Sequence, residues 1–312
     1  MRTSEPECGL LSLPVETDLD RIDAEVAFLG VPHGWAYPDI GATAGCADAP
    51  SAVRRRSLRL ARFIGHWDFD LDAPMELPQA VDAGDVPGDP LDGPGNARRT
   101  TEAVRTLLDR GAVPVCIGGD DSVPIPILRA FEGRGPLTVV QVDAHLDYRD
   151  EVDGVRDGYS SPMRRASEMS HVERIIHVGL RGIGSARAAD LEESRSAGNL
   201  LVTARQLHER GVPWLLQQLP ADGRLFLSFD FDGLDPSIFP AVSALAPGGL
   251  AYDEAADLLL GIGPRLSGAA FTEYVPDRDS HGLSALVACR LIGLVTRQSK
   301  VKQKLTRRFA RD

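Results

Sequence analysis

Cysteines are few in this sequence, and long apolar runs are lacking. The cysteines are far apart and form no Cys-x-x-Cys pair; they are Cys8, Cys46, Cys116 and Cys289. This spacing indicates neither a zinc knuckle nor a disulfide framework, so a reducing cytoplasm is the expected location. No run of about 18 apolar residues occurs, and no charged segment followed by an apolar one opens the chain. We therefore expect neither a membrane span nor a signal peptide.

Positive charge is also scarce. The 34 Lys and Arg residues stand against 45 Asp and Glu, which gives a formal net charge of −11. Because phosphate binding needs clustered Lys and Arg, nucleic acid is not expected as a main partner. An acidic chain suits a cationic small molecule better. Hydrophobic residues at 43% and charged residues at 25% are typical of a globular protein with a sizeable core.

The 312 residues are predicted to form one large domain, because no repeat and no linker-like break interrupts them. Residues 1–20 are expected to be an N-terminal extension. Residues 72–96 are rich in Pro, Gly and Asp, which predicts a surface excursion within the domain. Residues 298–312 form a basic tail. From Lys300 to Arg311 this tail is either a helix that lies on a neighbouring acidic subunit or a solvated terminal helix.

Short runs rich in Val, Ile, Leu and Phe alternate with segments of helical period. The expected strands are 26–31, 113–117, 137–142, 175–178, 200–203, 225–229 and 269–273. The expected helices are 49–64, 96–110, 123–131, 186–197, 252–261 and 283–297. This alternation predicts an α/β fold of three layers, in which helices cover both faces of a mainly parallel sheet.

Acidic residues directly follow three of the expected strands, at the carboxyl ends where open α/β sheets bind ligands. The three segments are Gly118–Ser122 with Asp120 and Asp121, Asp143–Asp147 with His145, and Asp230–Asp232. In the second segment the polar residues stand at positions i, i+2 and i+4. Their side chains therefore point to one face as long as the chain stays extended.

So many anionic groups would repel one another without a cation, since burying even one unpaired carboxylate costs several kcal/mol. Oxygen ligands with a single imidazole favour Mn²⁺, with Zn²⁺, Ni²⁺ or Fe²⁺ as alternatives. Two ions roughly 3.5 to 4 Å apart can share a bridging water, lower its pKa and present hydroxide to an electrophilic carbon. This pattern indicates hydrolysis. The alternative for Asp120 or Asp121 alone is an N-cap of the helix that follows.

Motifs along nearly the whole chain carry a resemblance. They are Gly30–Pro32, Gly45, Pro50–Arg54, Asp82–Val86, Gly118–Asp120, Asp143–Asp147, Ser228–Pro236, Pro247–Leu250 and Glu273. The Asp-Ala-His-x-Asp and Ser-x-Asp-x-Asp-x-x-Asp-Pro segments are highly specific when they occur together. The sequence resembles the ureohydrolases, a family that includes arginase, agmatinase, guanidinobutyrase and formiminoglutamase.

The resemblance implies a sheet of eight strands, two Mn²⁺ ions and a homo-oligomer, either a trimer or a hexamer. It also implies that Asp143 and Asp230 bridge the two ions. One coordination shell is then completed by Asp121 and Asp147, and the other by His145 and Asp232. The implied reaction is attack of the bridging hydroxide on a guanidine carbon, which releases urea and an amine.

Two catalytic roles follow from the same resemblance. Asp147 carries the proton to the leaving nitrogen. Glu273 matches the family position that pairs with the guanidinium, for which a buried carboxylate gives bidentate geometry. The alternative for Glu273 is an ordinary surface residue at the end of a strand.

Three departures from the family pattern indicate a divergent subgroup. Asp121 stands where the family has His, so a neutral ligand becomes anionic and opposes ionisation of a bound water. Tyr159 stands where the family often has His, and a phenol is a poor proton shuttle at neutral pH. Residues 241–246 replace a typical Gly-Thr-Gly-Thr-Pro segment.

The loop from Tyr148 to Ser161 is predicted to select the substrate. It holds four acids against two cations, namely Asp150, Glu151, Asp153 and Asp157 against Arg149 and Arg156. This balance favours an amine tail, so agmatine is the first predicted substrate and 4-guanidinobutanoate the second, although either arginine could reverse the order. A merely solvated loop is the alternative. With Glu273, the candidate substrate-binding residues are Tyr159, Asp157 and Arg149.

The function predicted from the sequence is that of a binuclear-metal amidinohydrolase acting on a guanidine compound. Two alternatives stay open. The loss of two histidines is also compatible with a catalytically silent homologue that serves as a regulatory or assembly subunit. A single-metal, deacetylase-like amidohydrolase is the other alternative, because that family shares the fold and an Asp, His, Asp metal triad.

Overall fold

An eight-stranded parallel sheet forms the centre of the protein, as the computed structural model describes it for residues 1–35, 37 and 44–295. Every pairing between neighbouring strands of this sheet is parallel. In spatial order the strands are β4 (Ala80–Asp85), β1 (Val26–Gly30), β5 (Val113–Ile117), β10 (Leu266–Thr272), β9 (Leu225–Asp230), β6 (Leu137–Val142), β7 (Val172–Leu180) and β8 (Leu200–Thr203). The predicted α/β fold is confirmed.

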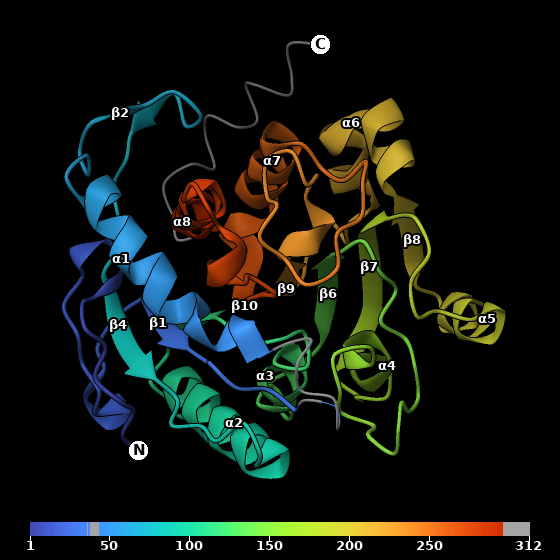
Figure 1. The fold of residues 1–312 in the computed structure, drawn as a ribbon, viewed down its shortest axis with the longest axis horizontal. Coiled ribbons are helices and arrows are strands. Elements are labelled where there is room, and N and C mark those ends of the chain that lie inside the picture. Colours follow the sequence, from blue (N-terminus) through green and yellow to red (C-terminus); the bar gives the residue numbers. More distant parts are fainter. Residues whose placement is uncertain (36, 38–43, 296–312) are drawn as a thin grey trace.

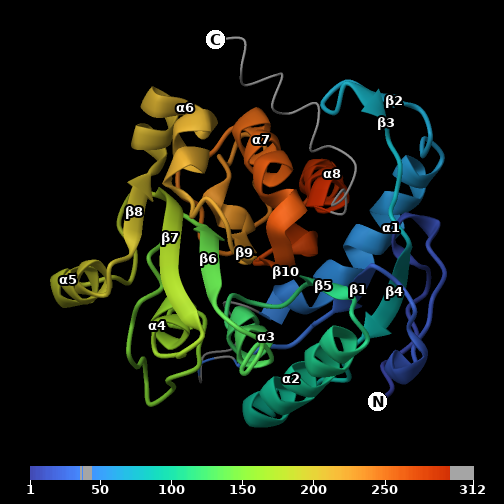
Figure 2. The ribbon, with the colours of Figure 1, turned by 180° about the vertical axis from the view of Figure 1, so that it is seen from behind.

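Helices cover both faces of the sheet (Figure 1). One core contains residues of α1 (Ala49–Ala61), α6 (Ala204–Gln218), α7 (Tyr252–Ile262) and α8 (Leu283–Val295). The core on the opposite face contains residues of α2 (Gly93–Asp109), α3 (Pro124–Arg129) and α4 (Pro162–Ser167). Seen from behind, α5 (Ala188–Ser196) lies beyond the edge strand β8 (Figure 2).

Alternation along the strands explains the two cores. In β1, Val26 and Phe28 belong to one core, whereas Ala27 and Leu29 belong to the other. Successive side chains of a strand point to opposite faces of the sheet. An uninterrupted apolar run therefore places apolar side chains in both cores. The continuous Val, Ile and Leu runs of the sequence therefore have a simple physical cause.

The region 72–96 differs from its prediction as a surface excursion. Residues 80–85 form the edge strand β4, which pairs with β1. The acids that made this segment look exposed are engaged by Arg54, which is buried and bonds Asp82 at 2.8 Å and Asp85 at 2.6 Å. A short antiparallel pair, β2 (Trp67–Asp68) with β3 (Ala73–Pro74), precedes it.

Other differences concern helices and ends. Helix α6 was not predicted, because Gly211 and Pro213 interrupt its pattern; Gly211 has a non-helical φ of 76°. Residues 1–20 are predicted as an extension, and part of this segment covers the exposed edge of β4 through a bridge between Ser4 and Asp85. Helix α8 begins at the predicted residue and extends at least to Val295. Residues 296–297 and the basic tail lie outside the described residues.

The strand order places the acidic segments together. Strands β5, β10, β9 and β6 are adjacent at the centre of the sheet, although they are distant in the sequence. All four are parallel, so their carboxyl ends reach the same edge. At or directly after these ends stand Gly118–Ser122, Glu273, Asp230–Asp232 and Asp143–Asp147. This edge is therefore the candidate functional site.

Candidate metal centre

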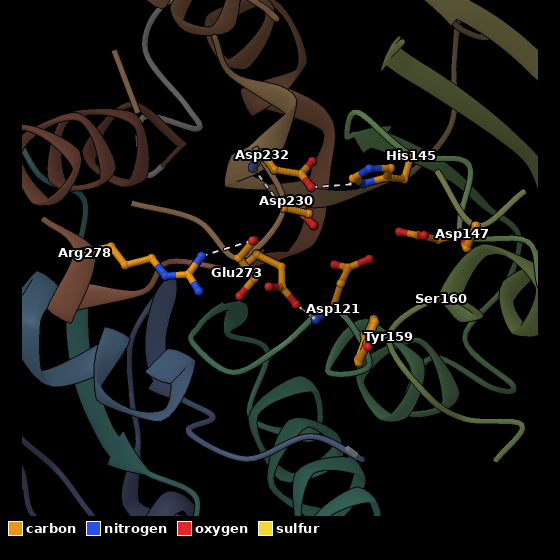
Figure 3. A pocket seen from close by; sticks show the side chains of 12 residues that line it. Asp121, His145, Asp147, Tyr159, Ser160, Asp230, Asp232, Glu273 and Arg278 are labelled. Carbon is orange, nitrogen blue, oxygen red and sulfur yellow. Dashed lines mark hydrogen bonds and ion pairs between the residues drawn. The ribbon is translucent and has the colours of Figure 1, made fainter. Parts of the chain in front are cut away.

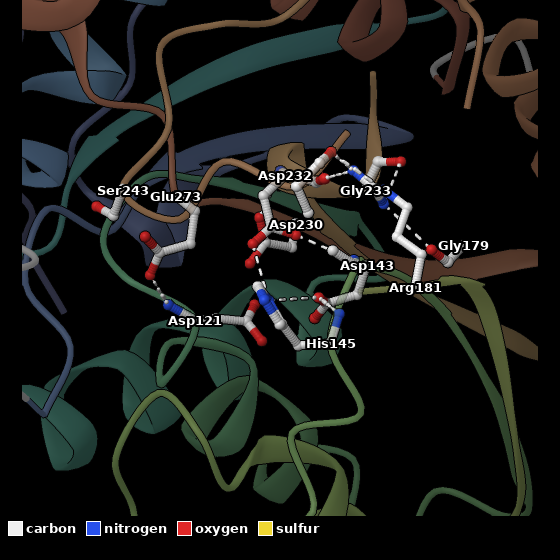
Figure 4. Close-up of polar contacts among 12 residues, drawn as sticks. Asp121, Asp143, His145, Gly179, Arg181, Asp230, Asp232, Gly233, Ser243 and Glu273 are labelled. Carbon is white, nitrogen blue, oxygen red and sulfur yellow. Dashed lines mark hydrogen bonds and ion pairs between the residues drawn. The ribbon is translucent and has the colours of Figure 1, made fainter. Parts of the chain in front are cut away.

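Two groups of possible metal ligands share one carboxylate, Asp143. The first group is Asp143, His145 and Asp232, and the second is Asp121, Asp143 and Asp230. Within each group the potential ligand atoms all lie within 4.8 Å of one another. A shared carboxylate between two sets of ligands suits a pair of cations, as two-metal hydrolytic sites require. Figure 4 shows these side chains converging from the ends of the strands.

Hydrogen bonds hold the first group in place. His145 Nδ1 lies 3.0 Å from Asp232 Oδ2 and 3.5 Å from Asp143 Oδ1. The backbone N–H of Ala144 donates to Asp232 Oδ1 at 3.0 Å. Behind this group, Arg181 donates to the carbonyl oxygens of Asp232 at 2.6 Å and Gly233 at 3.2 Å. The loop that carries Asp232 is thus fixed from both sides.

Asp121 has one oxygen that lacks a partner. Thr272 Oγ1 donates to its Oδ1 at 2.6 Å, but Oδ2 is buried and has no hydrogen bond within the described residues. A buried carboxylate oxygen without a donor is costly unless a cation is nearby. Asp121 belongs to the second group, so the donor set fits a hard divalent ion there.

The capping alternative for Asp120 and Asp121 does not match the local geometry. The residue that precedes α3 is Val123, and no side chain caps that helix. Asp120 instead accepts hydrogen bonds from the N–H of Ser122, at 2.9 Å, and from its hydroxyl. The turn before them needs Gly118 and Gly119, whose φ values are 123° and 59°.

Electrostatics at the site reflects crowding of anions. Burial first, and then the charges of neighbouring carboxylates, raise the pKa of Asp121, Asp147 and Asp230 well above the usual range. Burial and the charge of Asp143 likewise raise the pKa of Asp232 to about 6. In the absence of metal, bound protons can therefore neutralise these carboxylates. Divalent ions would compete with those protons for the same oxygens.

Asp143 and His145 behave as a pair. Hydrogen bonds with Asp143 and Asp232 raise the pKa of His145 to about 10, against the opposing effect of burial. Burial alone would raise the pKa of Asp143, but the hydrogen bond and charge of His145 outweigh it and hold that pKa below its usual value. A metal ion on these atoms would replace the imidazolium proton.

The chain leaves the extended conformation after Asp143, because β6 ends at Val142. Asp147 has a φ of 46° and belongs to neither ligand group, yet it lines the same pocket. The alternation expected to align Asp143, His145 and Asp147 therefore does not continue through the last residue. A turn, rather than a strand, brings Asp147 to the site.

Glu273 also has a left-handed backbone, with a φ of 66°. Its Oε1 accepts a hydrogen bond from the N–H of Asp121 at 2.9 Å, and Cys46 Sγ lies 3.7 Å from Oε2. Burial is the main reason that its pKa is raised to about 8. Strained backbone and a perturbed carboxyl in one cavity are typical of functional residues.

A cavity of about 350 Å³ opens above these groups. Figure 3 shows Asp147 and His145 on one side and Arg278 on the other, with Glu273 between them. Its lining also includes Asp121, Asp230, Asp232, Tyr159, Ser160, Ser185, Ser243 and Ala244. Sequence reasoning missed Arg278 and Ser185, because nothing in their local patterns marks them as pocket residues. Ser160 lies in the loop predicted to select the substrate, and Ser243 lies in the divergent residues 241–246, but neither serine was named as a site residue.

Of the three loop residues proposed for substrate binding, only Tyr159 lines this cavity. Its ring packs against Tyr37 with centroids 4.4 Å apart. Asp157 forms two hydrogen bonds with Arg129, at 2.6 and 3.0 Å, outside the cavity lining. Arg149 donates to the carbonyl of Ser185 at 3.2 Å and is likewise outside it.

A buried polar chain behind Asp143 was also missed. Gln141 Nε2 donates to Asp143 Oδ2 at 2.7 Å, and its Oε1 contacts His177 Nδ1. His177 Nε2 lies 3.4 Å from Ser194 Oγ. Burial lowers the pKa of His177 to about 3, so the imidazole is neutral. If His177 Nδ1 is the donor, each hydrogen bond in this series of side chains is donated in the direction of Asp143.

Within the described residues, none of the helices is both long and apolar enough to cross a membrane.

The fold and this edge together define an α/β protein with a carboxylate-rich candidate metal centre. The family described as "Arginase family" matches residues 24–296, so the chain belongs to the arginase, or ureohydrolase, family. The predicted resemblance is thus confirmed.

The relatives of the chain agree with this assignment. It is 30% identical over 294 residues to a mitochondrial agmatinase of Gallus gallus, covering 91% of this chain and 83% of the relative. It is 32% identical over 292 residues to a guanidinopropionase of Pseudomonas aeruginosa, covering 90% of this chain and 88% of the relative. Among solved structures, formiminoglutamase of Trypanosoma cruzi with Mn²⁺ is similar at a TM-score of 0.79 and 26% identity. The match covers 95% of this chain and 100% of that structure. The protein is therefore a hydrolase, an amidinohydrolase of the arginase family that acts on guanidino compounds.

Proposed function

We propose that this chain is a two-metal enzyme that removes the amidino group of a small linear guanidine compound as urea and leaves an amine. The observation that carries the proposal is the sharing of Asp143 between two ligand groups, beside a cavity that also contains Glu273. Relatives named agmatinase and guanidinopropionase support this reaction class.

Six side chains would hold the metal ions. They are Asp143, which both ligand groups share, together with Asp121, Asp147, Asp230, His145 and Asp232. Mn²⁺ is the proposed metal, supported by the oxygen-rich donor set and by the Mn²⁺ in the similar formiminoglutamase structure. When bound, such a pair of ions supplies Lewis-acid activation of a water molecule.

The remaining steps belong to side chains of the cavity. Glu273 would pair with the guanidinium and hold its carbon over the metal centre, since a planar cation and a carboxylate form a bidentate pair. Asp147 would hold a proton on its carboxyl oxygen and deliver it to the leaving nitrogen. Tyr159 would donate a hydrogen bond to the substrate.

From the sequence, agmatine is the first substrate and 4-guanidinobutanoate the second. Assembly as a trimer or hexamer and a cytoplasmic location also stay predictions.

The test is urea release by the purified protein with added Mn²⁺, on a panel of guanidines, with metal content measured on the same sample. We expect urea and two ions per chain. One ion per chain with release of acetate from acetylated amines would favour the deacetylase-like alternative. No urea from any guanidine with any divalent metal, followed by gain of activity in Asp121→His with Tyr159→His, would favour the silent homologue.

A further inference from the structure

Arg278 is an arginine in the lining of a cavity whose charged groups are mostly carboxylates. It ends the short helical turn Pro276–Arg278, five positions after Glu273, and it lines the cavity together with Ser243 and Ala244. Its Nη1 donates to the carbonyl oxygens of Val242, at 2.7 Å, and Ser243, at 3.0 Å. These two bonds orient the guanidinium, and Figure 3 shows it directed toward the cavity.

The side chain has no acidic partner among the residues that the structure describes. The neighbouring carboxylate of Asp279 is engaged elsewhere, since it accepts from Tyr274 Oη at 3.0 Å and from the N–H of Ala285 at 2.8 Å. Arg54, by contrast, is paired with Asp82. Arg278 is also exposed, so a ligand in the cavity can reach it.

Two of the four acids in the loop that favoured an amine-tailed substrate are paired with arginines within the protein. Asp157 is paired with Arg129, at 2.6 Å. Asp150 is paired with Arg156 at 2.9 Å and with Arg165 at 2.6 Å. None of the four acids of the loop lines the cavity. The negative balance read from the loop therefore does not act on the tail of a bound substrate.

We propose that Arg278 binds a carboxylate at the far end of the substrate, so that this enzyme prefers ω-guanidino acids to agmatine. The inference rests on the proposed function. Glu273 would take the guanidinium and Arg278 the acid, which matches opposite charges at the two ends of one molecule. Water then adds to the guanidine carbon, the bond from that carbon to the alkyl nitrogen breaks, and that nitrogen takes a proton. The products are urea and an ω-amino acid.

The test compares kcat and KM for 4-guanidinobutanoate, 3-guanidinopropanoate and agmatine with the Mn²⁺-loaded full chain. We expect the wild type to prefer the acids. Arg278→Gln should raise KM for the acids roughly 10- to 100-fold with little change in kcat, because hydrogen bonds between charged groups are lost. Agmatine should be unaffected or improve, and Arg278→Glu should make agmatine the preferred substrate.

The matched control is Arg156→Gln, which removes an arginine of the acidic loop that does not line the cavity. It should leave the ratio of acid to agmatine unchanged. Preference of the wild type for agmatine would overturn the inference. An equal loss on all substrates in Arg278→Gln would also overturn it, because Arg278 would then serve only to hold residues 242–243.

Failure of the proposed function is distinguishable from failure of this inference. If no guanidine yields urea, the proposed function fails, and calorimetry with the product analogues 4-aminobutanoate and putrescine still decides the role of Arg278. Binding of the acid that Arg278→Gln weakens at least tenfold supports the inference. Preferred binding of putrescine, or an acid affinity that Arg278→Gln does not change, overturns it.

Discussion

Gln141 donates a hydrogen bond to Asp143, with Nε2 2.7 Å from Oδ2. The two residues lie two positions apart at the end of β6, so both side chains project to the same face. His177, on the neighbouring strand β7, in turn fixes the amide orientation of Gln141. The shared carboxylate of the candidate metal centre is thus positioned by a fully buried chain of donors.

Gln141→Leu removes the donor but keeps most of the volume. We expect the affinity for Mn²⁺ to fall about 10- to 100-fold, the usual effect of losing a residue that orients a metal ligand. Calorimetric titration of the metal-free protein with Mn²⁺ measures this. Gln218→Leu, on α6 and away from the site, is the control. Equal affinities in the two variants would show that Asp143 does not need the amide.

Asp143 and Asp232 should differ in their effect on metal content. Asp143→Ala removes a ligand that both groups share, so we expect binding of both ions to be lost. Asp232→Ala removes a ligand of one group only, and about one ion per chain should remain. Elemental analysis after dialysis gives both numbers. Two retained ions in Asp143→Ala would contradict a shared ligand.

The metal-free protein should lose stability as the pH rises from 6.5 to 8. The folded pKa of Glu273 is raised to about 8 and that of His145 to about 10, from 4.5 and 6.5. In this window the folded state keeps protons that the unfolded state has lost, so unfolding becomes easier with rising pH. His177, lowered to about 3, affects stability only below pH 6.5.

Melting temperatures in a metal chelator, taken across this range, check the prediction. Glu273→Gln should flatten the decline, since the amide does not titrate. Saturating Mn²⁺ should raise the melting temperature most near pH 8, because the metal ions then neutralise the carboxylates. A melting temperature that climbs with pH in the chelator would refute this assignment of protons.

Arg54 is expected to be a major contributor to stability. Arg54→Met leaves Asp82 fully buried and without its ion pair, which should cost about 3 to 5 kcal/mol in the free energy of unfolding. The neighbour Arg55 is exposed and lies 3.8 Å from Glu7, so Arg55→Met should change stability by less than about 0.5 kcal/mol. Urea denaturation of both variants measures the difference, and similar midpoints would contradict the prediction.

Local patterns in the sequence were sufficient to predict several features of this protein. Runs such as Leu137–Val142 predict strands, because burial on two faces demands apolar residues at every position. The Asp143, His145 and Asp230, Asp232 spacings indicate a metal centre, since such carboxylates need a cation wherever they meet. These features depend on neighbours within a few residues, and the sequence displays such neighbours directly.

Only the tertiary structure decided which distant groups meet. Asp157 looked available to substrate until Arg129, 28 positions earlier, was found to bind it. Likewise, Arg278 lines the cavity, where it is held by hydrogen bonds to the carbonyl oxygens of Val242 and Ser243. A charge acts on whatever lies within a few ångströms, and long-range folding, not spacing along the chain, determines those neighbours.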